Sequence, residues 1–123
     1  MTPFGKKLRE MRSARCIALK TMAHEIGVSP AYLSALEHGH RGRPTWYLVQ
    51  RIIAFFNVIW DEAEELERLA EISDPKVSLY TAGLTPAVTE AANLFAKNIR
   101  ALTDADAQVV IRLVKGAEER SST

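Results

Sequence analysis

The chain has 123 residues, 47% of them hydrophobic and 25% charged, which is typical of one compact domain or of one domain with an appendage. No apolar run approaches the ~18 residues of a membrane-spanning helix, and a single cysteine, Cys16, excludes an internal disulfide bond. Lys6 and Lys7 are not followed by the apolar segment of a secretory signal, so we expect a cytoplasmic protein.

The charge is distributed unevenly along the chain. Residues 1–44 contain eight Lys or Arg and three Asp or Glu, a net charge of +5, although the whole chain carries only +1. Residues 45–123 contain eight Lys or Arg and twelve Asp or Glu, a net charge of −4. A basic N-terminal third beside an acidic remainder favours an anionic partner for the first part of the chain.

The first predicted helix spans residues 4–14. Its apolar side chains Phe4, Leu8 and Met11 share one face at helical spacing. The basic residues of this region point elsewhere, and we expect them to be partly solvated while they contribute to a positive electrostatic field. They are Lys6, Arg9, Arg12 and Arg15.

Two shorter helices follow, with a tight turn between them. They are predicted over 19–26 and 30–38, and Gly27 ends the first of them in a left-handed conformation. Ser29 can cap the second helix, and Pro30 suits its first position. Two helices this short bury too little area to stand alone, so their fixed angle must serve a purpose. The usual purpose of such a pair is to place the second helix in a groove of DNA.

A basic loop and two longer helices complete the first domain. The loop covers 40–44, and Thr45 caps a helix over 46–56. The next helix, over 59–72, carries many acidic residues on one face, which is most simply a solvated face that stays away from DNA. The aromatic residues of this region are expected in the core, where Trp46 locks its helix against the first helix or the loop. They are Trp46, Phe55, Phe56 and Trp60.

The sequence divides into a domain over 1–73, a linker over 74–84 and a C-terminal helical hairpin over 85–123. The linker contains Pro75 and Gly83 and has little periodicity. Three apolar residues of the linker are candidate anchors on the first domain. They are Val77, Leu79 and Tyr80.

The predicted hairpin has one apolar seam on each of its helices. Thr85 and Pro86 open the first helix, and the second is predicted over 105–118. The first seam has heptad-like spacing and comprises Val88, Ala92, Phe95, Ile99 and Leu102. Each seam needs a partner. We favour the same hairpin of a second chain, which makes residues 85–118 a dimerisation element; packing on the chain's own first domain is the alternative.

The turn and core positions of residues 4–57 form one extended pattern. It comprises residues 8–12, 19–27, 28–34, 36–39 and the Arg-Pro pair at 43–44. This pattern resembles the Cro/lambda-repressor-type (XRE-like) helix-turn-helix regulators. The resemblance implies an all-α fold, in which a five-helix lambda-repressor-like DNA-binding bundle is followed by the C-terminal hairpin. It implies nothing specific about residues 74–123.

In this family the third helix enters the major groove, so the resemblance implies base or backbone contacts from that helix. The residues are Ser29, Pro30, Ala31, Tyr32, Ser34, Ala35 and His38. This set lacks the arginine that usually reads guanine and the Asn or Gln that usually reads adenine. Ala31 and Ala35 suit thymine methyl groups, whereas Tyr32 suits a phosphate or a sugar. Few of these side chains can therefore form specific hydrogen bonds with bases, and we expect DNA shape or flanking basic residues to supply part of the specificity.

Basic residues beside the two short helices are the second set of expected contacts. Arg41 and Arg43 follow the third helix, where the chain of this family runs beside the phosphates. Such residues position a protein without specifying a base, although an arginine here can also reach a minor groove. Lys20 and Thr21 begin the second helix, and the resemblance places them toward phosphates as well.

The sequence therefore predicts a non-enzymatic repressor that binds double-stranded DNA as a homodimer on an inverted repeat. No cofactor and no metal are expected, because Cys16 and the histidines lack the spacing of zinc ligands. Two alternatives stay open. The chain is the antitoxin of a toxin–antitoxin pair that regulates its own operon, or it is a protein-interaction module that has lost DNA binding. A protein partner, such as a toxin or the polymerase, is unproven.

Overall fold

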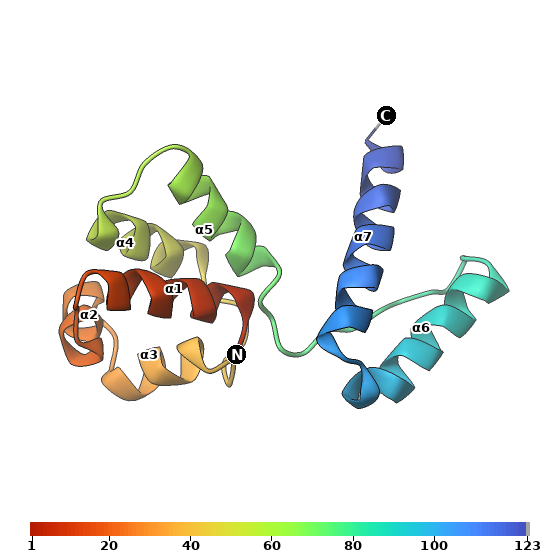
Figure 1. The fold of residues 1–123 in the computed structure, drawn as a ribbon, viewed down its shortest axis with the longest axis horizontal. Coiled ribbons are helices and arrows are strands. Elements are labelled where there is room, and N and C mark those ends of the chain that lie inside the picture. The colour runs from red at the N-terminus through yellow and green to blue at the C-terminus, as the bar shows by residue number, and fades with distance from the viewer. Residues whose placement is uncertain (123) are drawn as a thin grey trace. The chain divides into compact units, whose positions relative to one another are not determined.

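The computed structural model describes residues 1–122, which contain helices and no strands. The helices are α1 (Pro3–Ala14), α2 (Leu19–Ile26), α3 (Pro30–Glu37), α4 (Trp46–Phe56), α5 (Asp61–Glu71), α6 (Pro86–Asn98), the 3₁₀ turn η1 (Ile99–Ala101) and α7 (Asp104–Ser121). They form two compact units, Met1–Val77 and a second unit that begins at Ser78 (Figure 1). The predicted all-α fold, with five helices before a two-helix segment, is confirmed.

The first unit is built around α1. Helix α1 packs against α3 and α5, and α2 packs against α3 and α4 (Figure 1). Each of the five helices contributes at least one side chain that solvent does not reach. These side chains are Phe4, Leu8, Met22, Leu33, Ile52 and Leu66. Burial of six large apolar side chains, at roughly 1.5–3 kcal/mol each, is the main favourable term for this unit.

Local signals fix where these helices begin and end. The side chains of Thr2, Ser29 and Thr45 each accept a hydrogen bond from a backbone N–H in the first turn of α1, α3 and α4. Gly27 and Gly39 follow α2 and α3 with φ angles of +78° and +77°, which a glycine adopts without strain. Helix α3 ends at Glu37, one residue before its predicted end, and α5 begins at Asp61 rather than at residue 59.

A buried ion pair joins α1 to α3. The Arg12 guanidinium donates to both carboxylate oxygens of Glu37, at 3.1 Å from Nε to Oε2 and 3.0 Å from Nη2 to Oε1. The Glu37 side chain is 1% exposed and that of Arg12 is 16% exposed. A third bond, from Arg12 Nη1 to the carbonyl oxygen of Ile17, ties the same guanidinium to the α1–α2 connection. Arg12 is therefore a structural residue, which corrects its prediction as a partly solvated contributor to a surface field.

Two further contacts set how closely α1 approaches its neighbours. A Cβ atom at Gly5 would lie 2.3 Å from the carbonyl oxygen of Glu37, so only glycine allows α1 and α3 to come this close. The backbone N–H of Phe4 donates to Ser73 Oγ at 2.9 Å, and Ser73 Oγ donates to the carbonyl oxygen of Leu69. Ser73 is 3% exposed, so the start of α1 is held by the residues that follow α5.

The prediction that both tryptophans belong to the core is wrong. Trp46 is 64% exposed and Trp60 is 79% exposed, whereas Phe56 is buried. Trp46 is the first residue of α4, and the buried face of that helix is formed instead by Leu48, Val49, Ile52 and Phe56. Trp60 lies directly before α5 with a φ angle of +54°, in a connection that directs its ring outward.

The second unit contains no buried residue within its described part. The predicted continuous seam of its first helix is interrupted, because α6 ends at Asn98 and Ile99 begins the 3₁₀ turn. Helix α7 begins with a capping box, in which the side chains of Thr103 and Asp106 each accept a hydrogen bond from the other's backbone N–H. The predicted anchoring role of three linker residues is also wrong, because their side chains are mostly exposed. They are Val77, Leu79 and Tyr80.

The Arg12–Glu37 pair yields a stability prediction. We expect Glu37→Gln to lower the free energy of unfolding by about 2–3 kcal/mol, because it leaves a largely buried guanidinium without its charged partner. Urea denaturation followed by circular dichroism measures the change. The matched control is Glu10→Gln, which alters an exposed carboxylate on the same helix α1 and is expected to change stability by less than about 0.5 kcal/mol. Equal urea midpoints for the two variants would contradict the prediction.

Candidate nucleic-acid interface

The turn between α2 and α3 is held by backbone bonds and by one arginine. The N–H of Val28 donates to the carbonyl oxygen of Ala23 at 3.0 Å across the left-handed Gly27. Arg51 Nη1, from α4, donates to the carbonyl oxygen of Ile26 at 3.0 Å. The C-terminus of α2 is therefore capped by another helix, and the angle between α2 and α3 is fixed from both sides.

Helix α3 presents a buried face and an open face. Leu33, Leu36 and Glu37 form the buried face. The predicted contact residues lie on the rest of its surface: Ser29, Pro30, Ala31 and His38 are exposed, and Tyr32, Ser34 and Ala35 are half-buried. The structure therefore gathers all seven residues on one short helix and its two ends. Ser29 also has a structural role, because its Oγ caps α3 by accepting a hydrogen bond from the N–H of Tyr32 at 3.0 Å.

His38 closes the C-terminal end of α3. Its Nδ1 lies 2.8 Å from the carbonyl oxygen of Ser34. Because a carbonyl oxygen only accepts, Nδ1 carries the hydrogen and the other ring nitrogen is left for an external partner. In the neutral ring that nitrogen accepts a hydrogen bond, whereas in the cation it donates one, for example to a phosphate.

Lys20 and Thr21 lie in the first turn of α2, and both side chains are exposed. Within the described residues, no carboxylate pairs with Lys20. Helix α2 packs against α3, so this cation and the N-terminal backbone of α2 lie beside the open face of α3. Both features favour an anionic group at this position.

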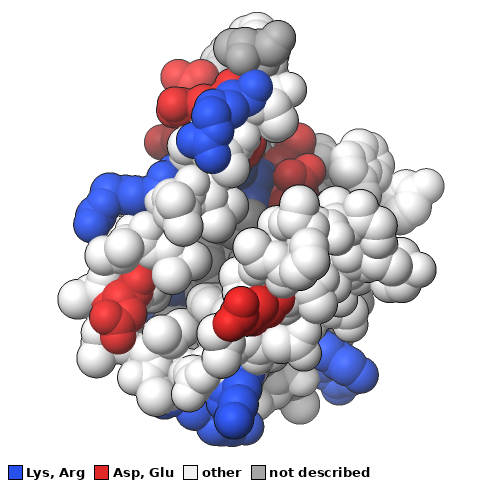
Figure 2. Space-filling view, turned by 90° about the vertical axis from the view of Figure 1, so that its right-hand side faces the viewer, with Lys and Arg blue, Asp and Glu red and all other residues white. Residues whose placement is uncertain are grey.

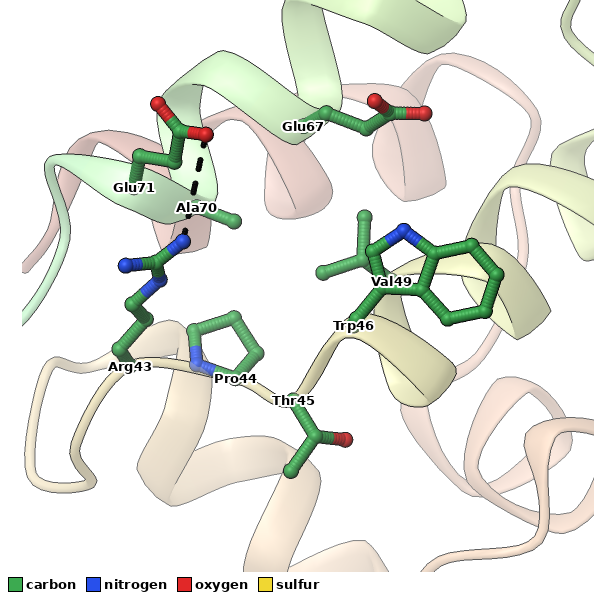
Figure 3. Close-up of a pocket in the computed structure, with 8 residues that line it drawn as sticks. All are labelled: Arg43, Pro44, Thr45, Trp46, Val49, Glu67, Ala70 and Glu71. Atoms are coloured by element: carbon green, nitrogen blue, oxygen red, sulfur yellow. Dashed lines mark ion pairs between the residues drawn. The ribbon is translucent and has the colours of Figure 1, made fainter.

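Arg43 is turned toward α5 rather than toward α3. Its Nη2 lies 4.0 Å from Glu71 Oε1, and the two side chains are 55% and 65% exposed. Figure 3 shows this pair at one end of a cavity of about 280 Å³ and Trp46 at the other end. An exposed pair at this distance contributes at most ~1 kcal/mol, so a phosphate can displace Glu71 at little cost.

Arg41 lies against the side chain of an α3 residue, Tyr32. Its guanidinium carbon is 5.3 Å from the centroid of the Tyr32 ring, a cation–π distance. The two arginines of the basic loop are alike in sequence, yet the structure assigns them different neighbours. One contacts the side chain of an α3 residue, and the other contacts α5.

Two features of this surface were not recognised from the sequence. Arg15 belongs to the fold, because its Nη1 donates to the carbonyl oxygen of Phe56 at 2.7 Å and its guanidinium carbon lies 5.1 Å from that ring's centroid. Trp46 and Tyr47 form an exposed aromatic pair at the start of α4, with ring centroids 5.3 Å apart and planes at 86°. No spacing rule distinguishes these roles, since each depends on contacts between residues far apart in the sequence or on how the start of α4 is packed.

The described residues contain no group of three or more His, Cys, Asp or Glu side chains that could hold a metal ion. None of the described helices is long and apolar enough to cross a membrane.

Comparison with known proteins agrees with this geometry. A family model described as a helix-turn-helix domain matches residues 3–66. The chain belongs to the helix-turn-helix domain family. This match confirms the family predicted from residues 4–57, an XRE-like helix-turn-helix regulator.

Two individual proteins are similar to this chain. An uncharacterised HTH-type transcriptional regulator, RghRB of Bacillus subtilis (strain 168), is 36% identical over 61 residues, which are 50% of this chain and 44% of that protein. The chain thus matches less than half of the length of this curated relative. A solved chain of the SinR protein/SinI protein complex is 19% identical, with a TM-score of 0.42, covering 80% of this chain and 99% of that one.

Proposed function

We propose that this protein is a sequence-specific regulator that binds double-stranded DNA and represses transcription by occupying its site. Helix α3 enters the major groove, and two copies of the chain bind an inverted repeat. The two α3 helices then lie about one DNA turn apart, roughly 34 Å. Occupancy of a promoter is sufficient for repression.

The observation that carries this proposal is the asymmetry of α3. Its buried face uses Leu33, Leu36 and Glu37 for the fold, while the side chains on its outer face are left open to solvent. Lys20 and Arg41 flank that face, and no described carboxylate pairs with either of them. A rigid helix with an open polar face and unpaired cations on two sides fits a polyanion with a groove.

The exposed apolar surface of the second unit supports the proposal of a homodimer. Its helices expose large apolar side chains, and a cleft of about 290 Å³ beside η1 is lined by Phe95, Ile99 and Ile111 among others. Figure 2 shows a face of the molecule on which most of the visible surface belongs to residues other than Lys, Arg, Asp and Glu. A segment that buries no residue gains little from folding alone, so it is expected to fold against a partner.

The second copy of the chain is the partner that the charges favour. Residues 78–123 contain five Lys or Arg and five Asp or Glu. Two copies therefore meet without net repulsion, as an isologous dimer interface requires. The same uncovered apolar surface supports the second candidate function, an antitoxin that wraps a toxin with α6 and α7. In that case the full chain alone would be a monomer and would dimerise only with the toxin bound.

The role of Arg43 can be tested by its effect on salt dependence. We expect Arg43→Ala to weaken binding to all duplex sequences about equally and to reduce the slope of log K against log[salt] by about one unit, because one phosphate contact is lost. Fluorescence anisotropy with a labelled duplex over a salt series measures both quantities. Lys76→Ala removes the same charge from an exposed position after α5 and is expected to leave the slope unchanged. An unaltered slope in Arg43→Ala would refute the phosphate contact.

The role of the second unit can be tested by truncation. Deletion of residues 84–123 should leave the first unit folded, since its core lies entirely within Met1–Val77, and should abolish dimerisation. Analytical ultracentrifugation is expected to show a dimer for the full chain and a monomer for the truncated chain. Circular dichroism with thermal unfolding serves as the control for a folded first unit. A truncated chain that still sediments as a dimer would place the interface elsewhere.

A further inference from the structure

We propose that Arg41, held against Tyr32, reads a guanine in the major groove and is the main determinant of base preference. The inference rests on the proposed DNA binding and assigns one particular readout to that site. It differs from the expectation drawn from the sequence, in which both loop arginines serve mainly as phosphate contacts.

The recognition helix itself lacks the side chains that read bases with two hydrogen bonds. Residues 30–37 contain no Arg, Lys, Asn or Gln. Arginine recognises guanine by donating to O6 and N7, and Asn or Gln recognises adenine in a similar way. Any such bidentate contact must therefore come from a residue outside α3 that the fold brings onto its surface.

Arg41 is brought onto that surface by a cation–π contact with Tyr32. Its guanidinium carbon lies 5.3 Å from the centroid of the Tyr32 ring. Tyr32 is half-buried and packs against the hydrophobic core, and its backbone N–H is fixed by Ser29. The ring is consequently a rigid support on α3 rather than a mobile surface group. A guanidinium that lies over one of its faces loses much of its rotational freedom before any DNA is bound.

The face of the Tyr32 ring offers the guanidinium no oxygen or nitrogen acceptor, so the N–H groups of Arg41 remain available to a base. A bidentate bond to guanine needs these N–H groups in a fixed plane, whereas a phosphate accepts from many directions. Because the supporting ring belongs to α3, the guanidinium lies with the helix that the proposed function places in the major groove. Insertion into the minor groove would require Arg41 to leave Tyr32.

Four other arginines of the first unit are less available. Arg12, Arg15 and Arg51 donate to Glu37, Phe56 and Ile26 respectively, within the fold. Arg43 is directed to Glu71 on α5. No described carboxylate pairs with Arg41, so its donors are not engaged in an ion pair.

The test uses the full-length protein and a randomised duplex library. Sites selected by the wild-type protein define the preferred sequence, and the affinity for that site is then measured with each base pair replaced in turn. The same measurements are made with Arg41→Ala, Arg41→Lys, Tyr32→Phe and Tyr32→Leu. Arg43→Ala serves as the matched loss of an arginine from the same loop. Circular dichroism confirms that the Tyr32 variants are folded.

We expect the wild-type protein to prefer guanine at one position of each half-site by about tenfold to a hundredfold over the other bases. That preference should disappear in Arg41→Ala. It should be weakened in Arg41→Lys, because lysine lacks the planar pair of N–H donors, and in Tyr32→Leu, because leucine lacks the aromatic ring that holds the guanidinium. Tyr32→Phe keeps the ring and should keep the preference. Arg43→Ala should retain the same preference at lower affinity.

Three outcomes would overturn the inference. If Arg41→Ala loses affinity equally at every site, Arg41 is a phosphate contact. If it instead loses a preference for A·T pairs, Arg41 reads a minor groove. In both cases the wild-type protein still selects a sequence, so the proposed function survives. If the wild-type protein selects no sequence and binds no duplex, the proposed function and the inference fail together.

Discussion

The orientation of the recognition helix depends on one buried charge pair. Glu37 lies on the inner face of α3, and the Arg12 guanidinium fixes its carboxylate with two hydrogen bonds. Because Gly5 lets the backbone of α1 reach Glu37 directly, α3 is held by a side-chain bond and a close backbone contact at the same residue. Breaking such a pair is costly, since it strands a charge away from water. The buried side of α3 is therefore held firmly to α1, and this fixes the direction in which the open face of α3 points.

Local signals explain which parts of this arrangement could be predicted from sequence. Ser29 and Thr45 cap the helices that they precede, and Gly27 supplies the left-handed turn, because each effect needs only a few neighbouring residues. The bond between Arg12 and Glu37 could not be predicted in this way, since 25 residues separate them. An arginine on a helix has the same sequence signature whether it is solvated or paired in the interior.

The aromatic residues and the basic loop show where hydrophobic and charge patterns are insufficient. Trp46 occupies the first position of α4, and periodicity alone does not reveal that Leu48 faces the core and Trp46 does not. Arg41 and Arg43 are separated by one glycine and look equivalent in the sequence. Their different neighbours, Tyr32 and Glu71, result from tertiary packing, so the candidate site was predicted as a set of residues but not as a geometry.

Each unit lacks something that the other can supply. The first unit has few groups that read bases, and the second unit has no buried residue of its own in its described part. The first unit has its own core, but its eight-residue recognition helix offers few base-reading groups, so a single copy gains little specific affinity. The second unit exposes its apolar residues and is expected to gain most of its stability from association. In the proposed dimer, such an association links two α3 helices and makes the second DNA-binding event effectively intramolecular. A helix that makes few base-specific contacts can then select a DNA site with two half-sites, because each copy needs to supply only part of the binding free energy.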